Sequence, residues 1–299
     1  MKDTNFYISS EVKRFSAYRR DKGWIDEQLT SERSVLLPTW CNKNLFSETN
    51  SLNPAFLPIT VKILNLCKDP IFLGVRNGKT YFAADTSHYE APTFDEIGIY
   101  RDLREVGTLL CHEDAAILAY ARAMTTWQRR HQFCGNCGSP TLSREAGHLL
   151  ACTNNGCNFL CFPRTDPAVI MLIHDGGDYC ILGRQATWRE GQNSVLAGFV
   201  EPGESLEGAV SREVYEEVGI HIRDIKYHSS QPWPFPSSIM LGFYGQAIDS
   251  ELKVDTSELE SARWYSKDEI NNCGQDDKFR LPRADSISRR LIDDWINRC

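Results

Sequence analysis

Residues 198–220 combine glycines, glutamates and valines at spacings that fit a tight turn followed by an amphipathic helix. They read Gly-Phe-Val-Glu-Pro-Gly-Glu-Ser-Leu-Glu-Gly-Ala-Val-Ser-Arg-Glu-Val-Tyr-Glu-Glu-Val-Gly-Ile. Residues three and four apart share one face of a helix, so Glu213, Glu216 and Glu217 are expected side by side. Apolar residues at the same spacing form a second stripe that can pack onto a core. These residues are Leu206, Val210, Val214 and Val218.

The ends of this expected helix carry residues typical of helix boundaries. Pro202 and Gly203 allow a tight turn, and Ser205 after them is a typical N-cap. Gly219 lies where a C-cap glycine is expected. The pattern therefore specifies the helix, its entry and its exit together.

The glutamates on this helix need a compensating charge, because like charges four residues apart destabilise a helix by a few tenths of a kcal/mol. Arg212 can pair with Glu216, four residues further along. The remaining charge suits hard divalent cations, which prefer oxygen ligands. Mg²⁺ is usually bound by carboxylates and a substrate phosphate together. A merely solvated acidic face would explain a bare E-x-x-E-E, but not the flanking glycines and caps.

Five of the eleven cysteines lie close together in the chain. Cys134 and Cys137 form a C-x2-C pair, and after a gap of fourteen residues Cys152 and Cys157 form a C-x4-C pair. Two such knuckles predict a zinc ribbon, in which four thiolates close the shell of one structural Zn²⁺ per chain. Cys161 leaves a competing C-x3-C knuckle with Cys157 open, although its apolar surroundings favour packing. Free core cysteines are the other alternative.

Composition and charge restrict the class of protein. The chain has 299 residues, a net charge of −7 and 41% hydrophobic residues, which suits about two globular domains. The negative charge gives no global attraction to nucleic acid or anionic membranes. The first residues lack an apolar signal region, and the longest apolar run, Ala168–Ile173, is too short to cross a bilayer. We expect a cytoplasmic protein with no membrane partner.

The region before the cysteines shows weaker patterns. Short apolar stretches separated by turns such as Asn77-Gly78 predict a small sheet-rich N-terminal domain over residues 1–128. A helix is expected to follow Asp114, with apolar residues at helical spacing as far as Trp127. The apolar stretches are Val35–Leu37, Val61–Leu64, Ile71–Val75 and Tyr81–Ala83.

The zinc ribbon is expected over residues 129–163 and a further domain over residues 164–299. In that domain, strands before and after the helix of residues 206–218 predict an α/β or α+β sandwich. A closing helix is expected over Ser286–Asn297. The expected strands are Ala168–Ile173, Tyr179–Gly183, Val195–Val200, Ile222–Tyr227 and Ile239–Ala247.

Residues 230–238 read Ser-Gln-Pro-Trp-Pro-Phe-Pro-Ser-Ser. Three prolines in five positions are incompatible with a central strand, so we expect a stiff surface loop. Trp233 and Phe235 could offer flat faces for stacking on a base or nicotinamide, and Gln231 could form hydrogen bonds to a ligand. The alternative is a polyproline II segment that only packs its aromatic rings or binds a partner.

These motifs, in the order zinc knuckles, glutamate-rich box and S-Q-P-W-P-F-P-x-S, resemble the NADH pyrophosphatase branch of the Nudix family. The resemblance covers about residues 114–299 well and the N-terminal third loosely. It implies an α-β-α sandwich that uses Mg²⁺ or Mn²⁺ to hydrolyse the pyrophosphate bond of NADH or NAD to NMN(H) and AMP. Removal of NAD caps from RNA 5′ ends, and a homodimer with composite sites, are also implied.

Two alternative functions are compatible with parts of the sequence. One is a Nudix hydrolase for ADP-ribose or another nucleoside diphosphate derivative, and the proline-rich motif speaks against it. The other is an RNA-binding module, which would require a damaged box, whereas Arg212, Glu213, Glu216 and Glu217 are all present.

The resemblance also implies a role for individual residues. Glu213, Glu216 and Glu217 would be catalytic, with the general base left unassigned among them. The later metal ligand is Glu258, with Glu260 as the alternative. The full metal-binding set is the backbone carbonyl of Ala197, Glu213, Glu217 and Glu258, and the zinc ligands are Cys134, Cys137, Cys152 and Cys157. Substrate contacts are assigned to Phe162 (where a tyrosine is common), Gln231, Pro232, Trp233, Pro234, Phe235, Pro236, Ser237, Ser238 and Ser288.

Overall fold

The computed structural model describes residues 5–48, 52–272 and 279–297. The chain divides into two compact units. The N-terminal unit consists of Tyr7–Thr165 together with Trp233–Ser237. The C-terminal unit consists of Met1–Phe6, Asp166–Pro232 and Ser238–Cys299. Within the described ranges, no helix is both long enough and apolar enough to cross a membrane.

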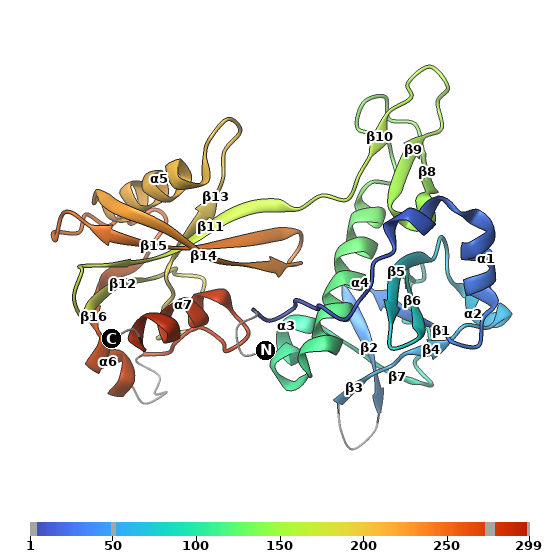
Figure 1. Cartoon of the computed structure of the whole chain (residues 1–299), viewed down its shortest axis with the longest axis horizontal. Helices are drawn as coiled ribbons and strands as arrows, with labels where there is room; N and C mark the ends of the chain where they lie inside the picture. The colour runs from blue at the N-terminus through green and yellow to red at the C-terminus, as the bar shows by residue number, and fades with distance from the viewer. Residues whose placement is uncertain (1–4, 49–51, 273–278, 298–299) are drawn as a thin grey trace. The chain divides into compact units, whose positions relative to one another are not determined.

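The N-terminal unit is built on a mixed sheet in the order β3-β2-β1-β6-β5, with β4 beside β1 and β7 beside β2. The pairing of β1 with β6 is parallel, and the other pairings are antiparallel. Helix α4 packs against β1, β5 and β6 (Figure 1). The elements are η1 (Ser16–Arg20), α1 (Lys22–Thr30), β1 (Ser34–Trp40), β2 (Lys43–Glu48), β3 (Leu52–Pro54), β4 (Leu57–Pro58), α2 (Val61–Leu66), β5 (Ile71–Arg76), β6 (Lys79–Asp85), β7 (Gly98–Arg101), α3 (Leu103–Val106), η2 (Gly107–Leu109) and α4 (His112–Arg130).

The sheet-rich character expected for this region is confirmed, with one correction. Val61–Leu64 was expected among the strand-like stretches but forms helix α2, because Thr60 accepts a hydrogen bond from the backbone N–H of Ile63 and caps the helix. The turn at Asn77-Gly78 does join β5 to β6, with φ angles of 51° and 73°. Positive φ at both central positions is the type I′ geometry that this dipeptide favours.

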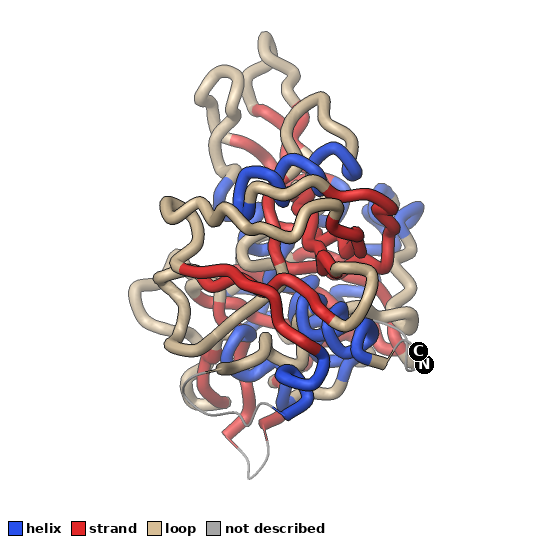
Figure 2. Tube along the Cα trace, turned by 90° about the vertical axis from the view of Figure 1, so that its left-hand side faces the viewer, coloured by secondary structure: helices blue, strands red, loops and turns tan. Residues whose placement is uncertain are grey.

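A small antiparallel sheet, in the order β10-β9-β8, follows α4 and belongs to the same unit. It comprises β8 (Thr141–Arg144), η3 (Glu145–Gly147), β9 (Leu149–Cys152) and β10 (Leu160–Cys161). His148 anchors it to the larger sheet, because the Nε2 of His148 lies 2.7 Å from the backbone carbonyl oxygen of Phe72 in β5. Loops join the strands, as the tan segments of Figure 2 show.

The C-terminal unit is a three-layer α-β-α sandwich. Its mixed sheet has the order β14-β15-β11-β12-β16, with β13 beside β11, and α5 and α7 lie on its two faces (Figure 1). The elements are β11 (Asp166–His174), β12 (Tyr179–Arg184), β13 (Leu196–Phe199), α5 (Leu206–Val218), β14 (Ile222–Trp233), β15 (Ser238–Ala247), β16 (Ser261–Ser266), α6 (Lys267–Asn272) and α7 (Ile287–Ile296).

The central strand β11 explains why both faces need a helix. Its side chains alternate between the two faces and are almost entirely apolar, as expected for a strand that is buried on both sides. Val169, Met171 and Ile173 pack with the valines of α5. Ile170 and Leu172 pack instead with residues of α7.

The proline-rich segment is only in part the surface loop that the sequence predicted, because residues 234–237 form a turn between β14 and β15, and Pro232 and Pro236 are exposed. Strand β14 continues through Gln231 and Pro232 to Trp233, and Gln231, Pro234 and Phe235 are buried. Because β14 is an edge strand, the missing N–H of Pro232 costs no hydrogen bond in the interior of the sheet. The rule that excluded a central strand was correct, but it left the edge position open.

His148 predicts a pH dependence of stability. Burial lowers its pKa to about 4, and the charges of Arg19 and Arg14 act in the same direction. Because the folded-state pKa lies below the unfolded value, the stabilisation is present above pH 6.5 and is lost as the pH falls toward 4, by up to about 3 kcal/mol. The midpoint of thermal unfolding should therefore fall more steeply over this range in the natural chain than in His148→Gln, which can still donate to Phe72. Parallel profiles would contradict this.

Candidate metal-binding and catalytic site

Helix α5 is capped as its sequence predicted. The Ser205 side chain accepts from the backbone N–H of Gly208, and Gly219 ends the helix in the left-handed region at φ 70°. On the apolar face of the helix, the side chains of Val210, Val214 and Val218 are fully buried. These contacts fix the rotation of the helix about its axis, and with it the direction in which its glutamates point.

Arg212 donates hydrogen bonds to several carboxylates on the charged side of α5. Its Nε and Nη2 bind the two carboxylate oxygens of Glu204 at 2.8 and 2.9 Å. Its Nη1 contacts Glu213 Oε1 and Glu216 Oε2, both at 2.9 Å, and its Nη2 also donates to the carbonyl of Phe199. These bonds use the whole guanidinium fork, which lysine could not reproduce. The predicted pairing with Glu216 is confirmed, and Glu204 and Glu213 join it.

Glu213 lies directly over the first glycine of the motif. A Cβ atom at position 198 would come within 1.8 Å of the carboxylate carbon of Glu213, so only glycine leaves room for this side chain. Burial raises the pKa of Glu213, while its contact with Arg212 acts in the opposite direction. Gly198 is therefore required by the close approach of a carboxylate.

Glu217 is the most constrained carboxylate of the site. It is only 3% exposed, and its Oε2 has no hydrogen-bond partner within the described ranges of the chain. Burial, followed by the charges of Glu213 and Glu258, raises its pKa from 4.5 to about 8. An orphaned buried oxygen close to two other carboxylates is the environment that a divalent cation would stabilise.

The two candidates for the later acidic ligand have different surroundings. Glu258 is exposed, and its charge raises the pKa of both Glu213 and Glu217. Glu260 is occupied by an ion pair with Arg184. The geometry thus favours Glu258. Ala197, in β13, is partly buried and pairs with Ile170 of the central strand.

The donor set fits a hard divalent cation held partly by water and substrate. In the described part of the chain, only the four cysteines bring all their ligand atoms within 4.8 Å of one another. The charges of Glu213 and Glu258 raise the pKa of Glu217, but the glutamates do not form so tight a cage. Mg²⁺ keeps several waters and is held by one or two carboxylates together with substrate phosphates, which suits this more open arrangement.

The predicted zinc ligands converge. Cys134 Sγ lies 3.7 Å from Cys157 Sγ, and Cys137 Sγ lies 3.4 Å from Cys152 Sγ. A tetrahedron with Zn–S bonds of about 2.3 Å has edges of about 3.8 Å, close to these separations. Cys161 is not part of the cluster. The C-x4-C spacing of the second knuckle is therefore confirmed over the competing pair.

The two knuckles share one hydrogen-bonding pattern. The backbone N–H of Asn136 donates to Cys134 Sγ, and that of Asn154 donates to Cys152 Sγ, both at 3.4 Å. The Asn136 side chain also donates to Cys157 Sγ at 3.3 Å. Donors around the sulfurs stabilise thiolates, so these residues fit a structural zinc ion.

The predicted substrate-binding residues are divided between the units. Phe162, 61% exposed, and Trp233–Ser237 belong to the N-terminal unit, whereas Gln231, Pro232, Ser238 and Ser288 belong to the C-terminal unit.

Gln231 and Ser288 are both committed to contacts inside the protein. The Gln231 amide donates to the carbonyls of Phe6 and Asp285 and accepts from the N–H of Ile287. The Ser288 hydroxyl lies 2.7 Å from that of Ser194. The ligand contacts predicted for these residues stay predictions.

Sequence reasoning missed the residues that hold the proline-rich segment. Tyr7, Arg104 and Arg122 contact it, from regions that lie far from it in the sequence. The sequence shows an arginine among the mostly apolar residues of helix α4, but no local pattern identifies its partner.

Three family models match successive parts of the chain. The description "NUDIX domain" covers residues 164–289, "NADH pyrophosphatase-like rudimentary NUDIX domain" covers residues 33–127, and "NADH pyrophosphatase zinc ribbon domain" covers residues 129–158. The N-terminal region, where the sequence resemblance was loose, is thus matched as well.

Similar curated proteins agree with these matches. The NAD-capped RNA hydrolase NudC of Mycobacterium bovis is 36% identical over 237 residues, covering 76% of this chain and 75% of that protein. The NAD-capped RNA hydrolase NUDT12 of Homo sapiens is 40% identical over 197 residues, covering 62% of this chain. The matched region spans 43% of the length of that relative, less than half.

A Nudix hydrolase structure from Nitrosomonas europaea aligns with 46% of this chain and 80% of its own, at 22% identity and a TM-score of 0.40. The family models and the Mycobacterium relative show that the chain belongs to the Nudix family, and its three domain matches are those of the NADH pyrophosphatase-like, zinc-ribbon branch.

Replacing Glu217 tests whether its carboxylate is a metal ligand. Without divalent cations, Glu217→Gln should unfold at a higher temperature than the natural chain, because it removes a desolvated carboxylate that costs up to about 3 kcal/mol at neutral pH. Folding raises the pKa of Glu217, so the difference in unfolding temperature between Glu217→Gln and the natural chain should grow as the pH rises from about 5 to 8. Adding Mg²⁺ should stabilise the natural chain and leave Glu217→Gln nearly unchanged. An equal gain in both proteins would contradict the assignment.

Zinc binding can be tested with a matched pair of cysteine variants. Cys157→Ser should lose most of its bound zinc, measured by mass spectrometry of the metal, and should unfold at a lower temperature. Cys161→Ser should retain one zinc per chain, because this thiol lies outside the cluster. Zinc loss in both variants, or in neither, would contradict the ligand set.

Proposed function

We propose that the chain is a metal-dependent pyrophosphatase that hydrolyses NADH and NAD to NMN(H) and AMP, and that it also removes NAD caps from RNA 5′ ends. The observation that carries this proposal is the buried, unpartnered carboxylate oxygen of Glu217 beside Glu213 and Glu258. The branch to which the chain belongs and the printed activities of its relatives support the substrate class.

The proposed ligands of the catalytic Mg²⁺ or Mn²⁺ are Glu213, Glu217, Glu258 and the backbone carbonyl of Ala197. A divalent cation bound there would neutralise the pyrophosphate and activate water for attack on phosphorus. The protein holds the oxygen atoms of these ligands in position for the cation. Arg212 orients Glu213, and Gly198 leaves room for its carboxylate.

Glu216 differs from its two neighbours and suits a supporting role. Its side chain is about half exposed, and its Oε2 is bound to Arg212 at 2.9 Å. We assign it to shaping the site by completing the hydrogen bonds of that guanidinium. Hydrogen bonds from Arg212 also lower the pKa of Glu204, which keeps a second anion at the start of the helix.

The zinc ion is assigned a structural role, because four thiolates leave no position for substrate. The homodimer, the cytoplasmic location and the domain boundaries at residues 128 and 163 stay predictions. ADP-ribose is the principal competing substrate, since it shares the pyrophosphate but lacks nicotinamide.

A substrate panel tests the proposed function. With Mg²⁺, the chain should release AMP from NADH and NAD faster than from ADP-ribose, and should remove the cap from NAD-capped RNA. Glu217→Gln should lower kcat by about a hundredfold or more, because several kcal/mol of charge stabilisation are lost. Glu251→Gln, an exposed glutamate on the chain segment after β15, should be unaffected. Faster turnover of ADP-ribose would favour the rival function, and binding of NADH without AMP release would indicate a binding module.

A further inference from the structure

We propose that Arg122 and Arg104 of the N-terminal unit position the segment Trp233–Ser237 for recognition of the dinucleotide. This inference rests on the proposed function and on the substrate contacts that the family resemblance predicts for that segment. Both arginines act through the segment and are therefore positioning residues.

The two arginines bind consecutive carbonyl groups of the segment. Arg122 Nε donates to the carbonyl of Pro234 at 3.0 Å, and Arg104 Nη2 donates to that of Phe235 at 3.1 Å. The prolines have no N–H groups, so the carbonyls are the main polar atoms through which this backbone can be held. Charge-assisted hydrogen bonds to adjacent carbonyls restrict both its position and its rotation.

The Phe235 ring is held by the same two side chains. The guanidinium carbons of Arg104 and Arg122 lie 4.9 and 4.7 Å from its centroid, within the range of cation–π contacts. The rings of Tyr7 and Trp233 meet it edge to face, at 5.9 and 4.9 Å between centroids. Phe235 is 7% exposed and is thus an anchor, whereas Trp233 is only partly buried and keeps ring surface for a ligand.

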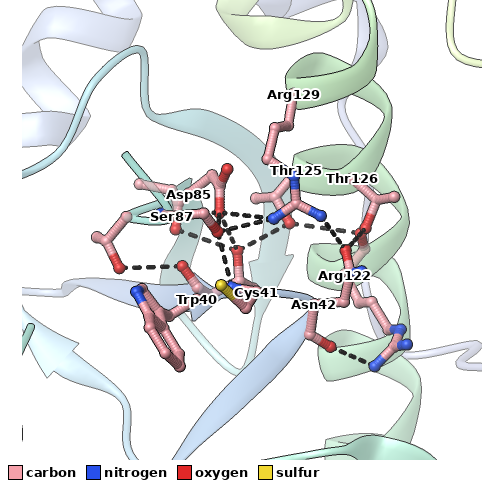
Figure 3. Close-up of polar contacts among 12 residues, drawn as sticks. Trp40, Cys41, Asn42, Asp85, Ser87, Arg122, Thr125, Thr126 and Arg129 are labelled. Atoms are coloured by element: carbon pink, nitrogen blue, oxygen red, sulfur yellow. Dashed lines mark hydrogen bonds and ion pairs between the residues drawn. The ribbon is translucent and has the colours of Figure 1, made fainter. Parts of the chain in front are cut away.

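Arg122 is itself fixed by the protein around it. It is 6% exposed, forms an ion pair with Asp102 at 3.0 Å and donates to the carbonyl of Asn42. Thr126 and Arg129, on the same face of α4, bind the side-chain oxygen of Asn42 (Figure 3). The face of α4 that meets the β1–β2 turn therefore holds the arginine rigidly.

The cost of burying this cation argues for a specific role. Burial lowers the pKa of Arg122, so keeping the charge requires compensation from Asp102 and from the carbonyls that it binds. An apolar residue could fill the same volume without that cost. What only the planar guanidinium provides is a simultaneous grip on the Pro234 carbonyl and the Phe235 ring.

The experiment compares two buried arginines of the same unit. Arg122→Gln removes the guanidinium that binds the Pro234 carbonyl and the Phe235 ring. Arg76→Gln is the matched control, because Arg76 is 9% exposed and its partners are Asp114 and Tyr81. KM and kcat are measured for NADH and for ADP-ribose, together with hydrogen–deuterium exchange of the peptide that contains residues 233–237.

Arg122→Gln is expected to raise KM for NADH about tenfold with little change in kcat, and to change KM for ADP-ribose much less, because a displaced recognition segment weakens binding without altering the metal-binding glutamates. Exchange of the 233–237 peptide should rise in Arg122→Gln and stay unchanged in Arg76→Gln.

Three results would overturn the proposal. The first is unchanged exchange in Arg122→Gln, and the second is an equal loss of NADH selectivity in Arg76→Gln, which would indicate general destabilisation. The third is faster exchange with unchanged selectivity, which would contradict the recognition role. If the natural chain hydrolyses no dinucleotide, the proposed function fails, and the role in recognition fails with it. The exchange comparison then shows separately whether the arginines hold the segment.

Discussion

Two buried carboxylates, and a third, exposed one whose charge acts on both, are the constraint around which the C-terminal unit is arranged. Glu217 is buried with an unpartnered oxygen, Glu213 lies against Gly198, and Glu258 raises the pKa of both. Such a cluster is unfavourable without a cation, since desolvation and like charge act in the same direction. The valines of α5 hold the helix against the sheet in spite of this cost.

Arg212 makes the cluster compatible with a folded protein, but it does not neutralise it. Its guanidinium binds three glutamates and a backbone carbonyl, yet none of these glutamates is Glu217. Among the described residues, Glu217 forms no ion pair with a basic side chain. A buried carboxylate with a raised pKa and no such partner is a candidate for a group that binds a cationic ligand.

The proposed chemistry and the proposed recognition depend on different parts of the chain. The glutamates belong to the C-terminal unit, whereas Trp233–Ser237 is held by α4 and by the residues just before it. The zinc ribbon follows α4 directly and is tied to the same unit by His148.

The sequence alone determined the elements whose information is local. The spacing of Val210, Val214 and Glu213 specified both faces of α5, Ser205 and Gly219 specified its ends, and two cysteine pairs specified the ribbon, because each pattern requires only residues within one helix or one turn. Only the tertiary structure decided that an oxygen of Glu217 lacks a partner, that Glu260 pairs with Arg184 while the charge of Glu258 acts on Glu217, and that Gln231 and Phe235 are buried. Those outcomes depend on burial and on long-range partners such as Arg122 and Arg184, and no spacing along the chain encodes them.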